Sequence, residues 1–463
     1  MMTNSQTVQF DADLLNKYNK SVPRYTSYPP ATELKPGVRE TDFRAGVVAG
    51  NHTKKPISLY CHIPFCETAC YFCGCNTIIT KNKRIAPLYL EYLIQDIRQT
   101  AALISPDRQV HQIHWGGGSP NYLNQPQLGQ LFSNLVKNFN ITQKAEVSIE
   151  INPRYIDKNY IFFLKKLGFN RISFGIQDFN SKVQAAINRI QPESMLFNVM
   201  GWIREAEFEG ANVDLIYGLP FQTLETFKET VKKTIKLNPD RIALFNFAYM
   251  PWLKVAQKNI SETDLPKAAE KLAIFQMTIA ELNRNGYIYI GMDHFAKPDD
   301  ELAIAQQEGK LHRNFQGYTT KPASDLFAFG VTAISMLNDI YIQNYKGLKS
   351  YYKALVSREL PIERGISLHQ DDIIRRAVIM ELMCQFKLNK SCFETKYNLQ
   401  FDFDQYFANE LVDLKSIAAD GLVKLFRDYI EVTPPGRLLI RNVVSVFDTY
   451  LKRRKDQSFS KAI

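Results

Sequence analysis

The sequence predicts an α/β protein built on a partial (β/α)6-type barrel, with an N-terminal arm and a C-terminal, mostly helical, winged-helix-like domain. From Ile57 to about Gly286, short β-rich apolar runs alternate with segments of helical period. This alternation implies a parallel sheet with helices outside it, wound right-handedly. After about residue 300 the alternation stops, and from about Gly365 the pattern is helical.

Six β-rich runs are expected to form the barrel strands: residues 57–63, 110–116, 145–151, 171–177, 211–217 and 241–248. Between the first two, apolar residues such as Leu90, Leu93 and Ile97 recur on one helical face. A further helix is expected to begin at Thr263 or Asp264, before Pro266, and to end at Gly286. The apolar run 287–293 is expected to add an edge strand.

The predicted domains are an arm over residues 1–50, the barrel with an extension over 51–345, and a helical domain over 346–463. In the arm, the prolines of Pro23–Pro29 restrict the backbone, so this segment is expected to lie extended. It either packs on the main domain as a surface arm or closes over an anion as a lid. The polar segment 311–318 is expected to be loop with little period.

Composition excludes several classes of protein. The chain has 463 residues, no apolar run long enough to span a bilayer and no secretory pattern at its start, which favours a cytoplasmic protein. Its net charge of +10 suits an anionic small substrate, because no nucleic-acid motif accompanies it, although a merely solvated basic surface is an alternative. We expect no membrane insertion, and a monomer.

The most informative stretch is Cys66–Cys75, which follows the first predicted strand. Cys66, Cys70 and Cys73 lie on one short loop, whose thiolates can surround one face of an iron–sulfur cubane. Structural zinc remains an alternative, although it usually takes two separated cysteine pairs. If the three cysteines hold three irons of a four-iron cluster, the fourth iron is open to a substrate. Cys75 could be a ligand, a thiol behind the ligands or a substrate-side group.

Polar groups also follow the carboxyl ends of later strands, where parallel α/β sheets place their catalytic residues. They are Gly116–Pro120, Glu150, Gln177 with Asp178, and Asp214. The glycine run lacks the dinucleotide-binding spacing, but its bare backbone admits the close approach of a small ligand. Glu150 suits two ribose hydroxyls as an acceptor, and a salt bridge at a strand end is its alternative role. We therefore expect one site at this rim.

The spacing Cys66-xxx-Cys70-xx-Cys73 is the cluster motif of the radical S-adenosylmethionine (SAM) superfamily. More narrowly, the chain resembles the oxygen-independent coproporphyrinogen III oxidases (dehydrogenases), a family of porphyrin synthesis for haem and chlorophyll. The resemblance covers nearly the whole chain. Beyond the cluster motif, it rests on these stretches: Pro23–Pro29, Cys75, Tyr217–Pro220, Ile290–Phe295, His312–Thr320 and Gly436–Arg441.

The resemblance implies a 4Fe–4S cluster and two SAM molecules. The cluster would be held by Cys66, Cys70 and Cys73. The first SAM would contact the open iron and residues Tyr60, Gly117, Glu150 and Ile334. The second would lie near Phe72, Gly118, Ser119, Gln177, Arg189, Asp214 and Ala248. Tyr60, Glu150 and Cys75 would take part in catalysis, whereas Cys61 points away from Tyr60 along the strand and is expected to be no ligand.

The resemblance also implies the reaction. An electron from the reduced cluster cleaves SAM to methionine and a 5′-deoxyadenosyl radical, which takes a hydrogen from the β-carbon of a propionate. Loss of carbon dioxide and one electron leaves a vinyl group. Two propionates of coproporphyrinogen III react, giving protoporphyrinogen IX. Arg24 and Arg313 are candidates for contact with the propionate carboxylates. A small electron-donor protein of the flavodoxin or ferredoxin type is the expected partner.

Three alternatives remain at this point. One is a radical SAM enzyme that acts on another tetrapyrrole or transfers a methyl group. The second is a haem-binding chaperone that kept the barrel but not the activity, which the arm segment Pro23–Pro29 and Cys75 disfavour because both resemble the oxidase. The third is a ferredoxin-like electron carrier, for which the barrel would be needlessly large.

Overall fold

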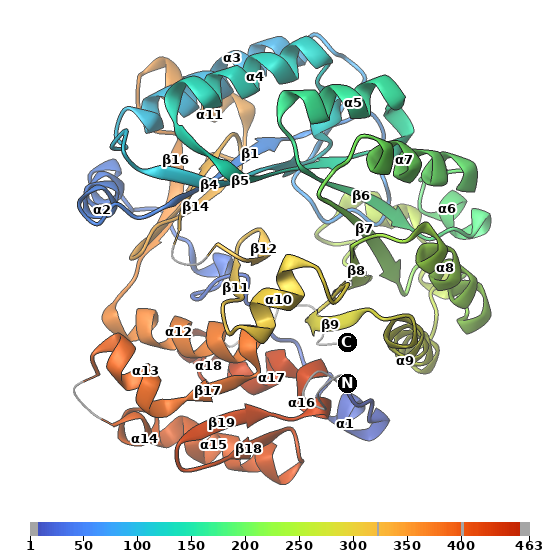
Figure 1. The fold of residues 1–463 in the computed structure, drawn as a ribbon, viewed down its shortest axis with the longest axis vertical. Helices are drawn as coiled ribbons and strands as arrows, with labels where there is room; N and C mark the ends of the chain where they lie inside the picture. Colours follow the sequence, from blue (N-terminus) through green and yellow to red (C-terminus); the bar gives the residue numbers. More distant parts are fainter. Residues whose placement is uncertain (1–7, 322–323, 400–401, 454–463) are drawn as a thin grey trace. The chain divides into compact units, whose positions relative to one another are not determined.

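The structure is a computed structural model that describes residues 8–321, 324–399 and 402–453 (Figure 1). It divides into two compact units, each built from separate stretches of the chain. The barrel unit comprises Glu33–Pro266 and Ala323–Ser367, and the terminal unit comprises Met1–Thr32, Lys267–Pro322 and Leu368–Ile463. The domain boundaries expected near residues 50 and 345 stay a prediction. Across the described ranges, no helix is both long and apolar enough to cross a membrane.

The barrel unit is organised around one sheet, whose strands within this unit follow the order β16-β15-β14-β13-β1-β4-β5-β6-β7-β8. The six strands at the end of this order run parallel: β1 (Ile57–Ile63), β4 (Gln109–Gly117), β5 (Asn140–Ile151), β6 (Arg171–Gln177), β7 (Gly210–Tyr217) and β8 (Arg241–Asn246). Each matches a predicted strand, although β5 begins at Asn140 rather than at residue 145. The predicted α/β class is therefore confirmed.

Helices cover the outer side of these strands (Figure 1). They are α3 (Ile85–Ala101), α4 (Gln125–Asn138), α5 (Lys158–Leu167), α6 (Ser181–Ala186), α7 (Glu193–Glu205) and α8 (Leu224–Leu237). The predicted apolar face of α3 is buried, since Leu90, Leu93 and Ile97 are at most 2% exposed. Side-chain caps fix two of the helix starts: Asn124 accepts from the Gln127 amide at α4, and Thr223 accepts from the Thr226 amide at α8.

Four strands on the other side of β1 were not predicted. β13 (Asp325–Phe329) runs parallel to β1, and β14 (Ile334–Met336), β15 (Ile340–Asn344) and β16 (Ile362–Ser367) continue antiparallel. All five residues of β13 are buried. A short run that is buried on both faces has no alternation, so its period does not distinguish a strand from a buried helix. The barrel unit also contains α2 (Glu40–His52) and α11 (Leu348–Val356).

In the terminal unit, two sequence expectations need correction. Helix α9 (Ala268–Arg284) begins later than expected, because Thr263 and Asp264 form a 3-10 turn and Pro266 disfavours helical backbone at the residue before it. The segment after residue 300 is not an irregular loop: it forms α10 (Glu301–Gln307) and the hairpin β11 (His312–Asn314) and β12 (Gly317–Thr319). The strand expected over 287–293 is confirmed as β9 (Ile288–Gly291), which pairs with β10 (His294–Ala296).

The C-terminal part of this unit is mostly helical, as predicted. A three-stranded sheet of order β17-β19-β18 lies among short helices, and β18 with β19 forms an antiparallel hairpin. The elements are α12 (Gln370–Gln385), β17 (Lys387–Asn389), α13 (Lys390–Tyr397), α14 (Phe403–Tyr406), α15 (Ala408–Ala419), β18 (Val423–Leu425), β19 (Tyr429–Val432), α16 (Pro434–Leu438), α17 (Ile440–Ser445) and α18 (Thr449–Arg453).

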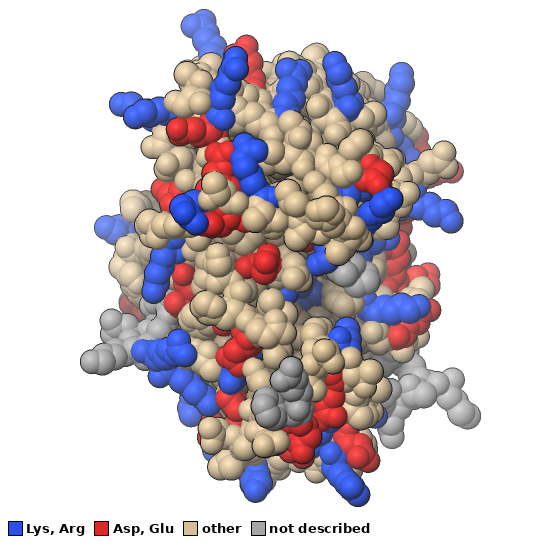
Figure 2. Space-filling view, turned by 90° about the vertical axis from the view of Figure 1, so that its left-hand side faces the viewer, with Lys and Arg blue, Asp and Glu red and all other residues tan. Residues whose placement is uncertain are grey.

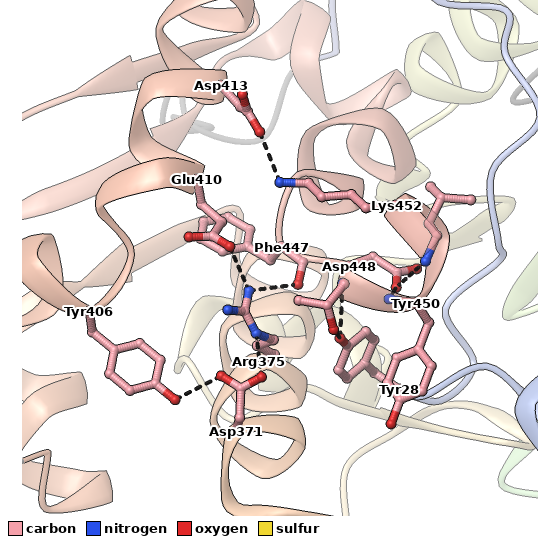
Figure 3. A network of polar contacts seen from close by, with 12 residues as sticks. Tyr28, Asp371, Arg375, Tyr406, Glu410, Asp413, Phe447, Asp448, Tyr450 and Lys452 are labelled. Carbon is pink, nitrogen blue, oxygen red and sulfur yellow. Dashed lines mark hydrogen bonds and ion pairs between the residues drawn. The ribbon is translucent and has the colours of Figure 1, made fainter. Parts of the chain in front are cut away.

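A buried ion-pair network joins these helices (Figure 3). Arg375 of α12 donates to Asp371 (2.7 Å), to Glu410 of α15 (2.8 Å) and to the Phe447 carbonyl (3.2 Å). The side chains of Arg375 and Glu410 are only 10% and 8% exposed. Removing one member would leave a buried charge without its partner, so this network ties α12 to α15.

The N-terminal arm packs on the same helices. After α1 (Ala12–Lys17), the Tyr25 hydroxyl donates to Asp448 (2.9 Å), and Arg441 Nε of α17 donates to the Pro23 carbonyl (3.0 Å). Tyr28 packs edge-on against Tyr450, with ring centroids 5.9 Å apart (Figure 3). The segment Pro23–Pro29 thus packs on C-terminal helices rather than on the main domain, where packing was expected, and closure as a lid stays a prediction.

Surface charge is mixed on the face drawn in Figure 2, where Lys and Arg side chains alternate with Asp and Glu. The excess of basic residues does not form a continuous basic patch on that face. This agrees with a solvated basic surface there, the alternative weighed for the net charge.

Candidate active site

The cysteine loop is closed by two short strands at the carboxyl end of β1. β2 (Phe65–Cys66) pairs in parallel with β3 (Ile78–Ile79), and the Thr80 amide donates to the Cys66 carbonyl (2.9 Å). The thiols of Cys66, Cys70 and Cys73 are free and partly buried, and Cys75 is exposed. The structure thus brings the three predicted ligands onto one short, closed loop.

Two guanidinium groups lie beside the central thiol of this loop. Arg154 Nη2 and Arg189 Nη1 donate to Cys70 Sγ at 3.6 Å and 3.5 Å. Ser119 Oγ lies 3.6 Å from Cys66 Sγ. Nearby cations favour the thiolate form of cysteine, which is the form that binds metal. The sequence analysis predicted Arg189 and Ser119 at the site but missed Arg154.

The thiols of Cys73 and Cys75 influence each other's pKa. A hydrogen bond between the two thiols lowers the pKa of Cys73 and raises the pKa of Cys75. Burial raises the pKa of Cys66 to about 11, although its contact with Ser119 acts the other way. The thiol of Cys75 thus lies next to that of Cys73, an arrangement that suits a thiol behind the ligands.

Strand register places three polar side chains side by side. Tyr60 of β1 is opposite His114 of β4, and His114 is opposite Ser148 of β5. The rings of Tyr60 and His114 stack with centroids 5.8 Å apart, and His114 Nδ1 lies 2.7 Å from Ser148 Oγ. Because side chains two residues apart share a face of a strand, Glu150 lies on the same face as Ser148.

The carboxylate of Glu150 is held by two donors. His114 Nε2 donates to Oε1 (3.4 Å), and the Gly117 amide donates to Oε2 (3.3 Å). Burial raises the pKa of Glu150, but the hydrogen bonds from His114 and Gly117 outweigh it and lower this pKa overall. Glu150 is therefore an ionised acceptor at neutral pH, fixed in orientation.

His62 orients the Tyr60 hydroxyl. His62 Nε2 lies 3.2 Å from the Asn76 carbonyl, which only accepts, so Nε2 carries the hydrogen. Burial lowers the pKa of His62, which keeps the ring neutral, and its Nδ1 then accepts from the Tyr60 hydroxyl (3.0 Å). The hydroxyl oxygen of Tyr60 keeps its acceptor capacity for a ligand.

The glycine run leaves no room for side chains. A Cβ at Gly116 would meet Glu150 Oε2 at 2.8 Å, and one at Gly118 would meet the Phe65 carbonyl oxygen at 2.7 Å. Gly117 has φ +112°, which a residue with a side chain rarely adopts. Close contact between this backbone and the cysteine loop thus depends on the glycines.

A second group of predicted residues lies at the ends of β6 and β7. Gln177 has φ +68°, and Arg189 Nη2 donates to the Gly175 carbonyl (3.0 Å). Within the described residues, Gln177 Oε1 and Arg189 Nε are buried without a hydrogen-bond partner. Burial, followed by repulsion from Glu150, raises the pKa of Asp214 to about 7. The two unsatisfied atoms are therefore available to a ligand that binds at the ends of these strands.

The remaining predicted residues, Phe72, Ala248, Ile334 and Asp178, differ in burial and in their hydrogen bonds. Gln257, which the sequence analysis missed, donates to the Phe72 carbonyl (3.5 Å) and the Ala248 carbonyl (3.1 Å) and so joins these two. Ile334 is half-buried on β14. Asp178, expected at the rim, is instead fully buried and accepts from Gln222 (2.6 Å) and Thr230 (2.7 Å). It therefore fixes a turn.

Comparison with known proteins places this site in a family. The model of the radical SAM superfamily matches residues 60–234, and that of the HemN C-terminal domain matches residues 368–439. The oxygen-independent coproporphyrinogen III oxidase of Synechocystis sp. is 61% identical over 466 residues, with 100% of both chains covered. The protein of that name from Salmonella typhimurium is 48% identical, with 99% of each chain covered. The chain belongs to the oxygen-independent coproporphyrinogen III oxidases.

A solved member of the oxidase family has the same fold. The structure of coproporphyrinogen III oxidase (HemN) from Escherichia coli, described as a radical SAM enzyme, superposes with a TM-score of 0.92 at 47% identity. The match covers 96% of this chain and 100% of that chain. The predicted family and fold class are thereby confirmed.

The residues of this oxidase fit the cluster and the SAM that its superfamily implies. Three free thiols share one loop, two arginines donate to the thiol of Cys70, and Gln177 and Arg189 hold unsatisfied polar atoms. Among the described residues, no three His, Cys, Asp or Glu side chains converge closely enough to mark a metal site by geometry alone. The ligands are therefore assigned by their spacing and by the family.

The predicted substrate residues lie in the terminal unit. Arg24 forms an ion pair with Asp293. Arg313 is 6% exposed, and its guanidinium lies over the Tyr318 ring at 4.6 Å. In the described part of the chain, Arg313 Nε and Nη1 have no hydrogen-bond partner. A buried guanidinium in this state is suited to a carboxylate ligand.

Proposed function

We propose that this chain decarboxylates two propionate side chains of coproporphyrinogen III oxidatively to vinyl groups, giving protoporphyrinogen IX. The observation that carries the proposal is the full-length match to oxygen-independent coproporphyrinogen III oxidases, combined with the thiol loop and the Glu150 carboxylate at one rim. When bound, the 4Fe–4S cluster and SAM would supply the 5′-deoxyadenosyl radical that takes hydrogen from the propionate.

The cysteine loop would hold three corners of the cluster through Cys66, Cys70 and Cys73. Arg154 and Arg189, which both donate to Cys70, would stabilise negative charge on that ligand. Cys75 would stay a thiol and donate to Cys73, which supports a role in tuning the cluster or acting on the substrate side. Its place in the predicted catalytic group, with Tyr60 and Glu150, stays a proposal.

Two SAM sites are part of the proposal. Glu150, ionised and held by His114 and Gly117, is suited to accept hydrogen bonds from the ribose hydroxyls of the first SAM, beside Tyr60 and Ile334. Support for a second site comes from the unsatisfied atoms of Gln177 and Arg189. The remaining groups of that second site would be Phe72, Gly118, Ser119, Asp214 and Ala248.

Arg313 and Arg24 would bind propionate carboxylates. Support comes from the buried guanidinium of Arg313, whose Nε and Nη1 have no partner within the described residues. Arg24 already pairs with Asp293, so it would have to exchange that carboxylate for one of the substrate's. A small electron-donor protein, a cytoplasmic location and a monomeric state also stay predictions.

Anaerobic reconstitution with iron and sulfide tests the proposal. With SAM, a reductant and coproporphyrinogen III, we expect 5′-deoxyadenosine and a product with two vinyl groups. Cys70→Ser is the matched control and should form neither. A titration with haem serves as the opposing test: tight haem binding without a vinyl product would support the chaperone and contradict the oxidase.

A further inference from the structure

The loop that leaves β8 exposes three large apolar side chains close together in the sequence. Trp252 is 79% exposed, Leu253 64% and Val255 73%. Ile190, between α6 and α7, is 55% exposed. Single exposed apolar residues are normal, but a group of them marks an interaction site. We refer to Ile190, Trp252, Leu253, Val255 and Lys258 as the Trp252 surface.

The Trp252 surface is formed by two segments, α6 with the residues that follow it and the loop after β8, and both are hydrogen-bonded to the cysteine loop. On one side, Lys254 Nζ donates to the Cys75 carbonyl (3.4 Å) and Gln257 Nε2 to the Phe72 carbonyl (3.5 Å). On the other side, the Tyr71 amide donates to the Ile187 carbonyl (3.0 Å), and Asn188 Nδ2 donates to the Ala69 carbonyl (2.8 Å). The surface is therefore separated from the cluster ligands by the backbone of their own loop.

A shared apolar cluster joins the two segments beneath the surface. Val183 and Ile187 of the first segment pack with Phe247 and Ile260 of the second. Tyr71 and Phe72 of the cysteine loop pack against the same cluster. The exposed side chains thus stand on a common, rigid base that includes the loop, rather than on a free loop tip.

The charge around this surface is strongly biased. The three segments are residues 66–83, 181–190 and 250–260, and their only acidic residue is Glu67, which pairs with Lys83 (2.7 Å). The basic residues that these segments offer to solvent are Lys81, Lys83, Lys182, Lys254 and Lys258, because Arg189 is buried and donates to Cys70. An apolar centre within a basic rim fits a partner with an acidic rim, and such complementarity speeds association.

We propose that the Trp252 surface docks a small acidic redox protein that delivers one electron to the cluster. The inference rests on the proposed function, because only a cluster on the cysteine loop needs this electron. In the step, the reduced donor loses one electron and the oxidised cluster gains it, and no atom is transferred. Trp252 is the central anchor, since tryptophan is enriched among residues that dominate binding energy, and weak redox complexes have small interfaces.

The test compares two electron sources on the reconstituted holoenzyme. Turnover of coproporphyrinogen III is measured with increasing reduced flavodoxin, an acidic one-electron donor, and separately with sodium dithionite. We expect the KM for flavodoxin to rise about tenfold in Trp252→Ala and in Lys258→Glu, because each substitution removes roughly one contact that anchors the donor. The dithionite-driven rate should stay within about twofold, because neither residue belongs to the site. Val356→Ala and Lys228→Glu are the matched controls, since Val356 and Lys228 are exposed on α11 and α8.

Two results would overturn the proposal. One is an unchanged KM for flavodoxin in both variants. The other is a raised KM for coproporphyrinogen III with dithionite, which would mean that this basic, apolar surface receives the anionic substrate. Failure of the wild-type enzyme with dithionite would contradict the proposed function instead. In that case calorimetry of flavodoxin binding to the holoenzyme still tests whether the Trp252 surface docks the donor. Weaker binding by Trp252→Ala than by the wild type supports the docking proposal, and equal binding refutes it.

Discussion

His114 Nε2 donates a hydrogen bond to the Glu150 carboxylate at 3.4 Å, while the ring of His114 stacks on Tyr60. One side chain on β4 thus contacts both Tyr60 and Glu150, the two residues that we propose for the first SAM site. We expect His114→Phe to keep the stack but lose the hydrogen bond. The loss of a hydrogen bond to a charged group costs about 1.5–3 kcal/mol, which weakens SAM binding by about tenfold or more.

Equilibrium dialysis of SAM against the reconstituted protein measures this effect. His114→Gln, which keeps a donor, is the matched variant and should recover most of the affinity. Iron and sulfide contents should equal those of the wild type in both variants. Unchanged SAM affinity in His114→Phe would show that Glu150 does not depend on His114.

Cys75 and Cys70 differ in what their replacement should do. Cys75 lies outside the three-cysteine spacing, so Cys75→Ser should still assemble a four-iron cluster. Cys70→Ser removes a ligand and should not. Iron and sulfide analysis of both purified variants decides this. Equal loss in both would refute the assignment of Cys75 as a thiol behind the ligands.

We expect Arg313 to lower the stability of the folded protein while it strengthens the binding of coproporphyrinogen III. Within the described residues its Nε and Nη1 have no partner, so Arg313→Met removes a buried, poorly paired charge. We expect the variant to unfold at equal or higher urea concentration than the wild type. Its KM for coproporphyrinogen III should rise by about thirtyfold or more, because a buried charge–carboxylate contact is lost. A variant that is destabilised and keeps its KM would make Arg313 structural.

The network around Arg375 predicts a clear contrast in stability (Figure 3). Arg375→Met leaves the carboxylate of Glu410 buried without its partner, so it should cost about 3–5 kcal/mol of unfolding free energy. The matched control is Lys452→Met, because the Lys452–Asp413 pair is exposed and should contribute at most about 1 kcal/mol. Urea unfolding compares the two. Similar costs would show that the buried network does not stabilise the unit.

Asp96 of α3 predicts a pH dependence. Its buried carboxylate accepts from the Gly330 amide (3.0 Å), the Asn344 amide (3.3 Å) and the Tyr351 hydroxyl (2.7 Å). Burial raises the pKa of Asp96 from 3.8 to about 7. Since the folded state binds the proton more tightly, this stabilisation is complete below the lower value and is lost as the pH rises through the higher one.

We therefore expect wild type to lose unfolding free energy relative to Asp96→Asn as the pH rises from 3.8 to about 7. Urea unfolding of both proteins at a series of pH values measures the difference. The amide introduced by this substitution keeps an oxygen acceptor for the same donors, so the fold should tolerate it. A difference that does not change with pH would contradict this account of Asp96.

The parts of the fold that sequence could predict are those with a local pattern. The six parallel strands and α3 follow apolar periods that local residues determine. β13 could not be predicted in this way, because its five buried residues have no alternation and its partner β1 lies far away in the chain. The hairpin of β11 and β12 has strands of three residues each, too short for a period to emerge.

The site residues also divide into those that a local sequence pattern predicts and those that depend on distant parts of the chain. The spacing of the cysteines identifies them in the sequence, whereas His114 enters the site through strand pairing and Arg154 through the turn that follows β5. His114 could have been found, because it shares a strand face with Gly116 and lies two residues before it. Arg154 lies in the 3-10 turn Pro153–Tyr155 after β5, where Asn152 accepts from its Nε, and only the three-dimensional structure shows that it reaches Cys70.

The central claim is a cluster bound at three corners, with its fourth iron open to SAM. Mössbauer spectroscopy of protein reconstituted with ⁵⁷Fe, recorded with and without SAM, tests it most directly. The account predicts that the signal of one iron in the cluster shifts when SAM is added and that the others stay unchanged. A spectrum that SAM leaves unaltered, or a protein that takes up zinc in place of iron, would contradict it.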